Sequence, residues 1–450
     1  MNRIALAAAV FGAALVSTSA RAEMALIGIG TINSSSAGAN ADLSKLTGKL
    51  ENGLPANLLG GFGSGLAYAG NGVFLAVPDR GPNATPYNAA VDETVSFISR
   101  FHTLTLGLAP AAAGAALPMT VTPQLTATAL LSSPTPLVYG TGAGLNLSNG
   151  APAENAANRF YFTGRSDNFD PKQPSTFPGN GRLDPESIAV SNDGKSVFLS
   201  DEYGPFVYQF DRATGQRTKT FALPTNFASS VLSPLGATEI AEGTQGRTAN
   251  KGMEGLTITP DGKTLVGVMQ AALLQDAAVA ATKKLVRFVT IDIASGATRQ
   301  FGYLLTDGSG VSDIVAINNH EFLADERDGA GLGDNSKAVV KKLFRFDIAD
   351  AKDITTLLGA DAAAAAVKKA PVLDLVQALG AHGIAPEKVP AKIEGIAFGP
   401  DVTIAGATRH TLVIANDNDF LPDVAGPNQL FVFAFTDADL PGLVPQQIAQ

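Results

Sequence analysis

The sequence predicts an all-β protein of the β-propeller class, on three observations. A short pattern of two apolar runs joined by a tight-turn dipeptide recurs along the chain. Most copies are followed by further runs that alternate large apolar residues with other residues. Charged residues are only 16% of the chain, whereas Gly and Pro number 47 and 26, which favours many turns over long solvated helices. Radial repetition of small antiparallel sheets is the propeller architecture.

The repeat is clearest in two segments that coincide without gaps at an offset of 68 residues. Glu186–Glu202 reads "ESIAVSNDGKSVFLSDE", and Glu254–Gln270 reads "EGLTITPDGKTLVGVMQ". Weaker copies are Gly65–Gly81, Asp313–Asp328 and a copy that opens at Glu394 and closes at Asn416–Asp419. The Asn-Gly and Asp-Gly dipeptides tolerate positive φ and close tight hairpins. Each copy is therefore expected to be a β-hairpin.

Third strands follow four of these hairpins and would complete small sheets. Their residues are 206–211, 286–293, 343–348 and 430–435, each with the two-residue period of a strand. A degenerate copy between Thr126 and Arg165 would bring the total to six blades, with five or seven as alternatives. The early apolar segment 25–32 is expected to pair with the last blade and close the ring.

One segment departs from the β pattern. Residues 361–383 are rich in Ala, with Leu and Val at helical spacing, and Pro371 should divide them into two short helices. We expect a helical insertion between blades.

The N-terminal residues are typical of a signal peptide. A short positive start is followed by the apolar run 4–16 and an Ala-x-Ala pattern that ends at Ala22. Residues 1–22 would be removed, leaving 23–450 as one domain in a periplasmic or secreted protein. The apolar run is too short to span a bilayer. No cysteine is present, so neither disulfides nor thiol chemistry is expected.

The net charge of the chain limits the classes of binding partner that we expect. The formal net charge is −9, and loss of Arg3 and Arg21 with the leader makes it more negative. An acidic protein is poorly suited to bind nucleic acid or anionic membranes. We expect a monomer that takes a small-molecule ester and binds cations.

Carboxylates gather at one end of the predicted hairpins. The start of the first strand and the end of the second lie together in an antiparallel hairpin. Leading acids would therefore form a ring at one mouth of the channel: Glu186, Glu254, Asp313 and Glu394. Acids that close the hairpins would surround the same mouth: Asp79, Asp201, Glu202, Asp325, Glu326, Asp417 and Asp419. Carboxylates this dense repel one another unless cations neutralise them, and their hard oxygens suit Ca²⁺.

The type of each residue predicts its role at this mouth. The expected Ca²⁺ ligands are Asp79, Glu186, Asp201, Glu202, Glu254, Asp313, Glu394 and Asp417. The expected catalytic acids are Glu186, Glu202, Glu254, Glu326 and Glu394. The basic residues of the same segments, expected to hold substrate, are Arg80, Arg165, Lys251 and Arg327. An ion pair between blades is the alternative role for Glu202 and Arg80.

Six phrases carry a family resemblance. They are "DRGPN" (79–83), the stretch 184–205, "NKGMEGLTITPDGKTL" (250–265), "ADERDGAG" (324–331), "IEGIAFGP" (393–400) and "NDNDF" (416–420). In this order they resemble the bacterial phytase-like family, described by "esterase-like activity of phytase". The resemblance implies an exported β-propeller that hydrolyses phosphoesters or esters.

The sequence therefore supports an exported metal-dependent hydrolase that acts on a phosphoester. A Ca²⁺-dependent lactonase or carboxylic esterase is the alternative enzyme, and a non-catalytic binding module of the cell envelope is the alternative from another class. Arg80 and Arg327 would discriminate among these, because a phosphate group needs cations beside the metal ligands.

Overall fold

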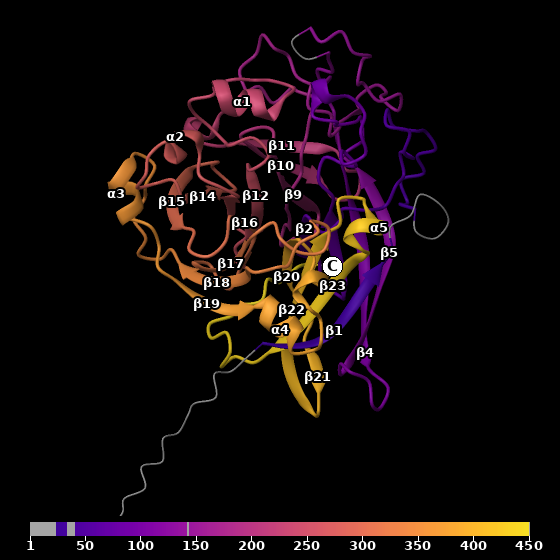
Figure 1. The fold of residues 1–450 in the computed structure, drawn as a ribbon, viewed down its shortest axis with the longest axis vertical. Helices are drawn as coiled ribbons and strands as arrows, with labels where there is room; N and C mark the ends of the chain where they lie inside the picture. The colour runs from indigo at the N-terminus through magenta and orange to yellow at the C-terminus, as the bar shows by residue number, and fades with distance from the viewer. Residues whose placement is uncertain (1–23, 34–40, 142–143, 450) are drawn as a thin grey trace, which may run out of the picture.

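The computed structural model describes residues 24–33, 41–141 and 144–449, and its architecture is a five-bladed β-propeller. The expected signal peptide, residues 1–22, lies outside the described residues. Figure 1 shows the blades arranged around a centre, with the chain running from indigo to yellow around the ring. No helix in the described ranges has both the length and the apolar character needed to cross a membrane.

Each blade is an antiparallel sheet whose strands follow one another in the chain. Blade 1 contains β2 (Gly65–Tyr68), β3 (Val73–Val77), β4 (Arg100–Pro110) and β5 (Met119–Leu130). Blade 2 contains β8 (Ile188–Val190), β9 (Ser196–Ser200), β10 (Phe206–Asp211) and β11 (Arg217–Ala222). Blade 3 contains β12 (Met253–Ile258), β13 (Thr264–Met269), β14 (Leu285–Asp292) and β15 (Thr298–Leu304). Blade 4 contains β16 (Gly310–Ala316), β17 (Glu321–Arg327), β18 (Lys341–Asp347) and β19 (Lys369–Asp374).

Blade 5 joins the two ends of the described chain. It contains β20 (Lys392–Phe398), β22 (Ala407–Asp417), β23 (Asn428–Phe435) and β1 (Ala25–Ile32), with the short β21 (Val402–Ile404) paired to β22. The N-terminal strand β1 pairs antiparallel with β23, from Ala25 opposite Ala434 to Ile32 opposite Asn428. Figure 1 shows this closure as indigo beside yellow. The predicted pairing of residues 25–32 with the last blade is therefore confirmed.

The prediction of six blades is wrong. Residues 126–130 belong to β5, the outer strand of blade 1. The rest of the expected sixth unit forms only β6 (Ser132–Ser133) and β7 (Phe160–Tyr161), a two-stranded sheet. It extends blade 2, because Ser132 bridges Gln216 in parallel just before β11.

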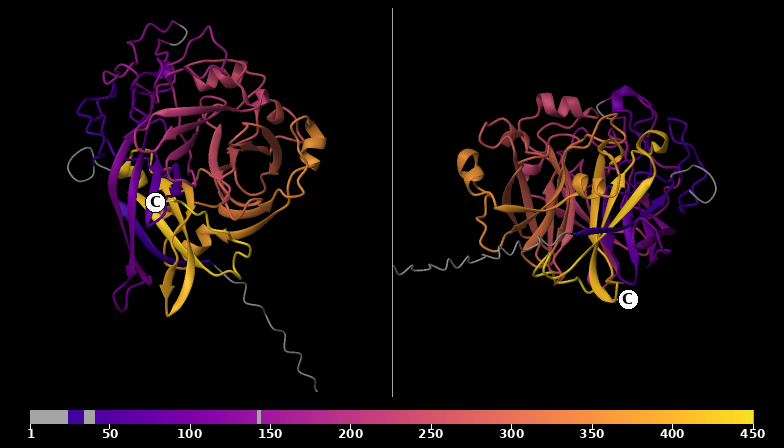
Figure 2. Two further views of the ribbon diagram at one scale, coloured as in Figure 1. Left: turned by 180° about the vertical axis from the view of Figure 1, so that it is seen from behind. Right: turned by 60° about the horizontal axis from the view of Figure 1, so that its bottom comes forward.

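The expected helical insertion is correct only in part. Two short helices occur there, α3 (Gly359–Ala364) and α4 (Leu375–Gly380), but β19 lies between them and contains Pro371. This segment supplies the outer strand of blade 4, where an edge strand tolerates a proline that cannot donate a ladder hydrogen bond. Figure 2 shows α3 at the outer rim from behind as well. The remaining helices are α1 (Gly236–Glu242), α2 (Leu274–Ala277) and α5 (Pro422–Ala425), with 3-10 turns at Ala89–Val91, Thr225–Phe227 and Pro386–Lys388.

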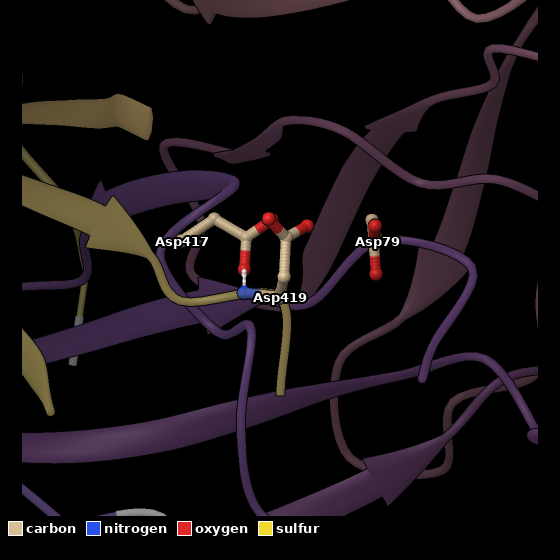
Figure 3. A group of neighbouring side chains, drawn as sticks. All are labelled: Asp79, Asp417 and Asp419. Carbon is tan, nitrogen blue, oxygen red and sulfur yellow. Dashed lines mark hydrogen bonds between the residues drawn. The ribbon is translucent and has the colours of Figure 1, made fainter. Parts of the chain in front are cut away.

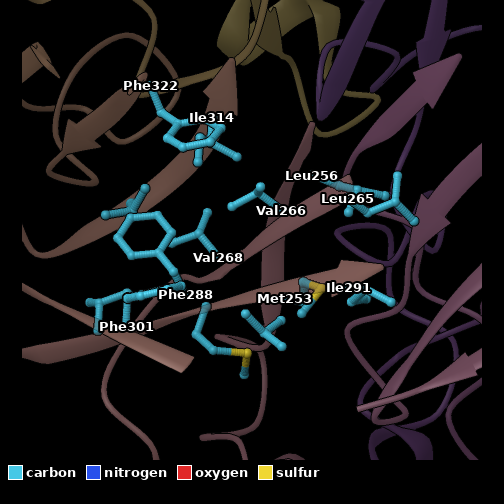
Figure 4. Packing of buried hydrophobic residues seen from close by; sticks show 14 of the residues in the cluster. Met253, Leu256, Leu265, Val266, Val268, Phe288, Ile291, Phe301, Ile314 and Phe322 are labelled. Carbon is cyan, nitrogen blue, oxygen red and sulfur yellow. The ribbon is translucent and has the colours of Figure 1, made fainter. Parts of the chain in front are cut away.

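The core lies between successive blades. Figure 4 shows one such layer, in which Val266 and Phe288 of blade 3 pack near Ile314 and Phe322 of blade 4. The inner strands β2, β8, β12, β16 and β20 also pack edge to edge around the axis. This packing leaves the ends of the inner hairpins as the places where polar groups can converge.

Candidate functional site

Hairpin register defines which side chains meet at the mouth. A corresponding backbone hydrogen bond near each turn joins Ala69 to Val73, Ser191 to Ser196, Thr259 to Thr264, Ile317 to Glu321 and Gly399 to Thr411. Counting five residues back from the first member of each pair gives the inner ring: Ser64, Glu186, Glu254, Ser312 and Glu394. Counting six residues forward from the second member gives the outer ring: Asp79, Glu202, Gln270, Arg327 and Asp417.

The three glutamates of the inner ring are buried although they are charged residues. Their exposed fractions are 8% for Glu186, 6% for Glu254 and 4% for Glu394. One oxygen of Glu254 accepts from Gln270 and one oxygen of Glu394 accepts from Arg327. The second oxygen, Oε2, is buried in both and has no hydrogen-bond partner among the described residues. A buried acid with a free lone pair is costly unless something completes it.

A first carboxylate cluster forms where blade 2 meets blade 1. Oxygens of Asp184, Glu186 and Glu202 lie within 4.8 Å of one another. Arg80 binds Asp184 twice, through its backbone N at 2.8 Å and through Nη1 at 2.6 Å. Nη1 also lies 3.5 Å from Glu202 Oε2, and the backbone N of Gly252 donates to Glu202 Oε1 at 2.7 Å. The expected ion pair between Arg80 and Glu202 is present, but Asp184 is the closer partner.

A second cluster consists of Asp79, Asp417 and Asp419, again within 4.8 Å of one another. Figure 3 shows Asp417 at the end of β22 and Asp419 just beyond it, with the backbone N of Asp419 hydrogen-bonded to Asp417, and Asp79 on a separate segment facing them. Lys392 Nζ lies 3.1 Å from Asp417 Oδ2 and contacts Asp419. The protein therefore places an ammonium group of its own in this cluster.

Burial makes the mouth resist full ionisation. It raises the pKa of Glu202 to about 8 and that of Asp79 to about 7. Burial and then the neighbouring carboxylates Glu254 and Asp184 raise the pKa of Glu186 well above its usual range. Burial likewise raises the pKa of Glu254, with Glu202 and Glu394 adding to it. Additional positive charge would let these groups ionise together.

Asp313 lies below the ring and not in it. Ser312 occupies the inner-ring position of blade 4, so Asp313 is one residue deeper. Its Oδ1 lies 2.9 Å from Ser187 Oγ, and its Oδ2 accepts from the backbone N of Ile396 at 2.9 Å. Both carboxyl oxygens of Asp313 have hydrogen-bond partners, and the side chain reaches across the channel from blade 4 to Ser187 of blade 2. We therefore do not retain Asp313 as a metal ligand.

Other expected site residues lie away from the mouth. Glu326 accepts from Tyr303, Lys369 and the backbone N of Gly308, and so anchors a loop of blade 4. Burial would raise the pKa of Glu326, but Lys369 and the backbone donors outweigh it and hold the pKa below its usual value. Arg165 is fully buried and binds Asp167, at 2.5 Å from Nε to Oδ1.

The three remaining residues lie at the edge of the site. Asp201 Oδ1 accepts from the backbone N of Asp184 and of Tyr203, which makes it a turn anchor beneath the first cluster. Asp325 Oδ2 accepts from Ser312 Oγ at 3.1 Å. Lys251 is exposed beside Gly252. Arg80 and Arg327 are the two expected cations that do reach the mouth.

Sequence reasoning missed Asp184 and Lys392, although both follow a simple rule. Each stands two residues before an inner-ring glutamate, in "DPE" (184–186) and "KIE" (392–394). Gly252 holds this position in blade 3 and donates its backbone N to Glu202. The residue two before the leading acid therefore contacts the outer ring in all three blades.

Comparison with known proteins gives the family. The family model "Phytase-like: Esterase-like activity of phytase" matches residues 57–420. An "Uncharacterized secreted protein" of Arthroderma benhamiae is 31% identical over an alignment of 259 residues that covers 48% of this chain and 46% of that protein. The chain thus spans about half the length of this curated relative.

Solved propellers are similar only distantly. The periplasmic gluconolactonase of Pseudomonas aeruginosa is 12% identical, with a TM-score of 0.33 over 83% of this chain and 89% of that one. A putative 6-phosphogluconolactonase of Bacteroides fragilis is 12% identical, with a TM-score of 0.31 over 89% and 92%. The family match covers most of the chain, which therefore belongs to the phytase-like family described as having esterase-like activity of phytase.

Proposed function

We propose that the protein is an exported, metal-dependent hydrolase that cleaves a phosphoester at the acidic mouth of the propeller. The observation that carries this proposal is the cluster of Asp184, Glu186 and Glu202 with Arg80 on its edge. Metal ligands and a guanidinium side by side are the combination that phosphoryl oxygens require.

A divalent cation fits the donor set of this mouth. All donors are hard oxygens, which favours Ca²⁺ over softer metals. Asp184, Glu186 and Glu202 would hold it, and the buried Oε2 atom of Glu394 supplies a lone pair with no partner in the described chain. When bound, the ion would neutralise the carboxylates and polarise a phosphoryl oxygen.

Side chains of the protein would bind the phosphate group and accept the proton of the attacking water. Arg80 of blade 1 and Arg327 of blade 4 would orient phosphate oxygens by charge-assisted hydrogen bonds. Glu254 is held at Oε1 by Gln270, so its Oε2 is the atom that would accept a proton from the attacking water. The water oxygen bonds to phosphorus and the ester P–O bond breaks. The leaving oxygen takes a proton from solvent, and Glu254 returns the proton that it accepted to solvent.

Export is supported by two observations. Residues 1–22 have the pattern of a signal peptide. The curated relative is described as secreted. Mass measurement of the mature protein, with an N-terminus expected near Glu23, tests this part of the proposal.

A substrate panel tests the activity. Purified protein would receive aryl phosphates, phytate, aryl acetates and lactones, in EDTA and after addition of Ca²⁺. Phosphoester turnover that needs Ca²⁺ and is lost in Glu254→Gln is the expected result. The matched control is Glu321→Gln, because Glu321 lies at the opposite end of β17 and pairs with Arg345. Turnover of acetates or lactones alone would make the protein a carboxylic esterase, and no turnover would leave a binding module.

A further inference from the structure

A layer of small residues narrows the channel directly below the inner ring, and we call this layer the neck. It consists of the next residue along each inner strand: Gly65, Ser187, Gly255, Asp313 and Gly395. A Cβ atom added at Gly65 would lie 2.5 Å from the Cα atom of Ser187, and one added at Gly255 would lie 2.8 Å from the Cα atom of Asp313. Inner strands of neighbouring blades therefore touch at this level. Asp313 and Ser187 span the space that remains, at 2.9 Å from Oδ1 to Oγ.

A cavity of about 100 Å³ lies on the side of the neck away from the acidic mouth, and we call it the lower chamber. Three consecutive residues of every inner strand line it: 66–68, 188–190, 256–258, 314–316 and 396–398. None of the described residues that line it is charged. The hydroxyl of Thr257 on its wall is already bonded, because its Oγ1 accepts from the backbone N of Ala316 at 3.2 Å. The two compartments of the channel thus differ sharply in charge.

Residues 441–449 lie over the end of the lower chamber, and we call this segment the strap. The backbone N of Val444 donates to the carbonyl of Ile317 in blade 4 at 2.8 Å. The backbone N of Ala449 donates to the carbonyl of Asn192 in blade 2, also at 2.8 Å. The strap therefore crosses from the turn of one inner hairpin to the turn of another. Its residues on the chamber wall are Val444, Pro445, Gln446 and Ile448.

Gln446 fastens the middle of the strap. Its Nε2 donates to the carbonyl of Val190 at 2.8 Å and to Oδ1 of Asn192 at 2.7 Å. The next residue, Gln447, instead donates to the carbonyl of Pro445 within the strap, at 3.3 Å. Gln447 and Pro445 are exposed, so the outer side of the strap faces solvent. Lifting the strap would break a few hydrogen bonds and uncover the lower chamber.

We propose that the lower chamber is a separate binding site for a small uncharged apolar molecule, about the size of one aromatic ring, which enters when the strap lifts. A cavity of about 150 Å³ with apolar walls stays free of water and binds benzene, and the lower chamber is of the same order. An anion would lose its hydration there without gaining a cation, which is costly. The neck keeps this ligand apart from the mouth, so binding depends neither on metal nor on the proposed function.

Thermal melts of the protein in EDTA, with benzene and separately with benzoate, test the site. Benzene should raise Tm until the site is saturated, because it binds the folded state alone. Benzoate has the same ring but a charge, and it should leave Tm unchanged. A Tm that benzene does not raise, or that benzoate raises equally, would overturn the proposal.

A variant that fills the lower chamber tests the location. Val315 lines the chamber and is half-buried. Val315→Phe should weaken benzene binding about tenfold or more, because the larger side chain takes up the volume. Val339→Phe is the matched control, since Val339 is 68% exposed and lies outside the chamber. Equal binding by both variants would place the benzene elsewhere.

Strap variants test the route of entry and leave the inner strands intact. Gln446→Ala should speed the release of fluorobenzene, measured by fluorine NMR, about tenfold, because it removes two hydrogen bonds that hold the strap down. Gln447→Ala is the matched control and should release fluorobenzene at the wild-type rate. Equal release rates in all three proteins would overturn entry beneath the strap. Crystals under xenon pressure supply an independent readout, in which xenon bound only outside the lower chamber would contradict the site itself.

Discussion

Asp313 of β16 meets Ser187 across the neck of the channel, with 2.9 Å between Asp313 Oδ1 and Ser187 Oγ. The two residues belong to blades 4 and 2, which are not neighbours in the ring. Ser187 Oγ also lies 3.2 Å from the carbonyl of Leu256, which can only accept a hydrogen bond. A hydroxyl has one hydrogen. Ser187 can therefore donate to only one of these two oxygens, and we predict that it donates to Leu256 and accepts from a protonated Asp313.

The predicted direction requires a neutral Asp313. Burial raises the pKa of Asp313 well above its usual range, which agrees with a protonated acid. Asp313→Asn should preserve both contacts, since the amide nitrogen can donate to Ser187 while the amide oxygen accepts from Ile396. We expect a change in unfolding free energy below about 1 kcal/mol for Asn and a loss of about 2–3 kcal/mol for Ala. Denaturant titration measures both, and equal losses would contradict a protonated Asp313.

Sequence reasoning found the fold and part of the mouth, because both follow from hairpin geometry. Glu186 and Glu202 meet as expected, since an antiparallel turn returns the chain to its starting end. Glu326 was misplaced because the outer ring falls one residue later, at Arg327, and side chains alternate between faces of a strand. Asp313 does not take the ring position because it lies one residue closer to the turn of its hairpin than Glu186 does in blade 2.

The blade number and the cations depend on contacts that no local pattern contains. The segment after β5 has strand-like residues, yet only β6 and β7 form, and they extend blade 2. Lys392 enters the second cluster because β20 begins beside the end of β22. The pocket lined by Arg80, Arg182 and Arg247 joins loops from blades 1 and 2 with α1, so its residues are scattered in the sequence.

Calcium should stabilise the folded protein and act mainly through the first cluster. Binding to the folded state alone raises Tm by mass action. Glu202→Gln should reduce the rise in Tm on adding Ca²⁺, because it removes one carboxylate of the three. Glu321→Gln should leave the rise unchanged. Thermal melts with EDTA and with excess Ca²⁺ check this, and an identical transition in both for the wild type would exclude a metal site.

Breaking the Arg327–Glu394 pair should be costly. Both side chains are nearly buried, at 10% and 5% exposure. Arg327→Met leaves Glu394 without its cation, and removal of one partner of a buried pair costs about 3–5 kcal/mol. The double variant Arg327→Met with Glu394→Gln should recover much of this loss. Chemical denaturation of the single and double variants measures the coupling, and additive losses would show that the pair is not coupled.

Without metal, the protein should lose stability as the pH rises. The pKa values of Asp79 and Glu202 are raised to about 7 and about 8 in the folded state. A raised folded pKa means that the native state binds the proton more tightly than the unfolded chain. The stabilising contribution is therefore complete below the unfolded pKa, near 4. It is lost as the pH rises through 7 and 8.

The expected result is a Tm in EDTA that falls between pH 5.5 and pH 8.5. Calcium should flatten this slope, because a bound cation takes the place of the protons that the carboxylates otherwise hold. His410, whose pKa is raised by Asp401 and Asp437 despite its burial, contributes with the same sign far from the mouth. Its share should persist in Ca²⁺ and disappear in His410→Gln. A slope in EDTA that Ca²⁺ leaves unchanged would place the titrating groups outside the acidic mouth.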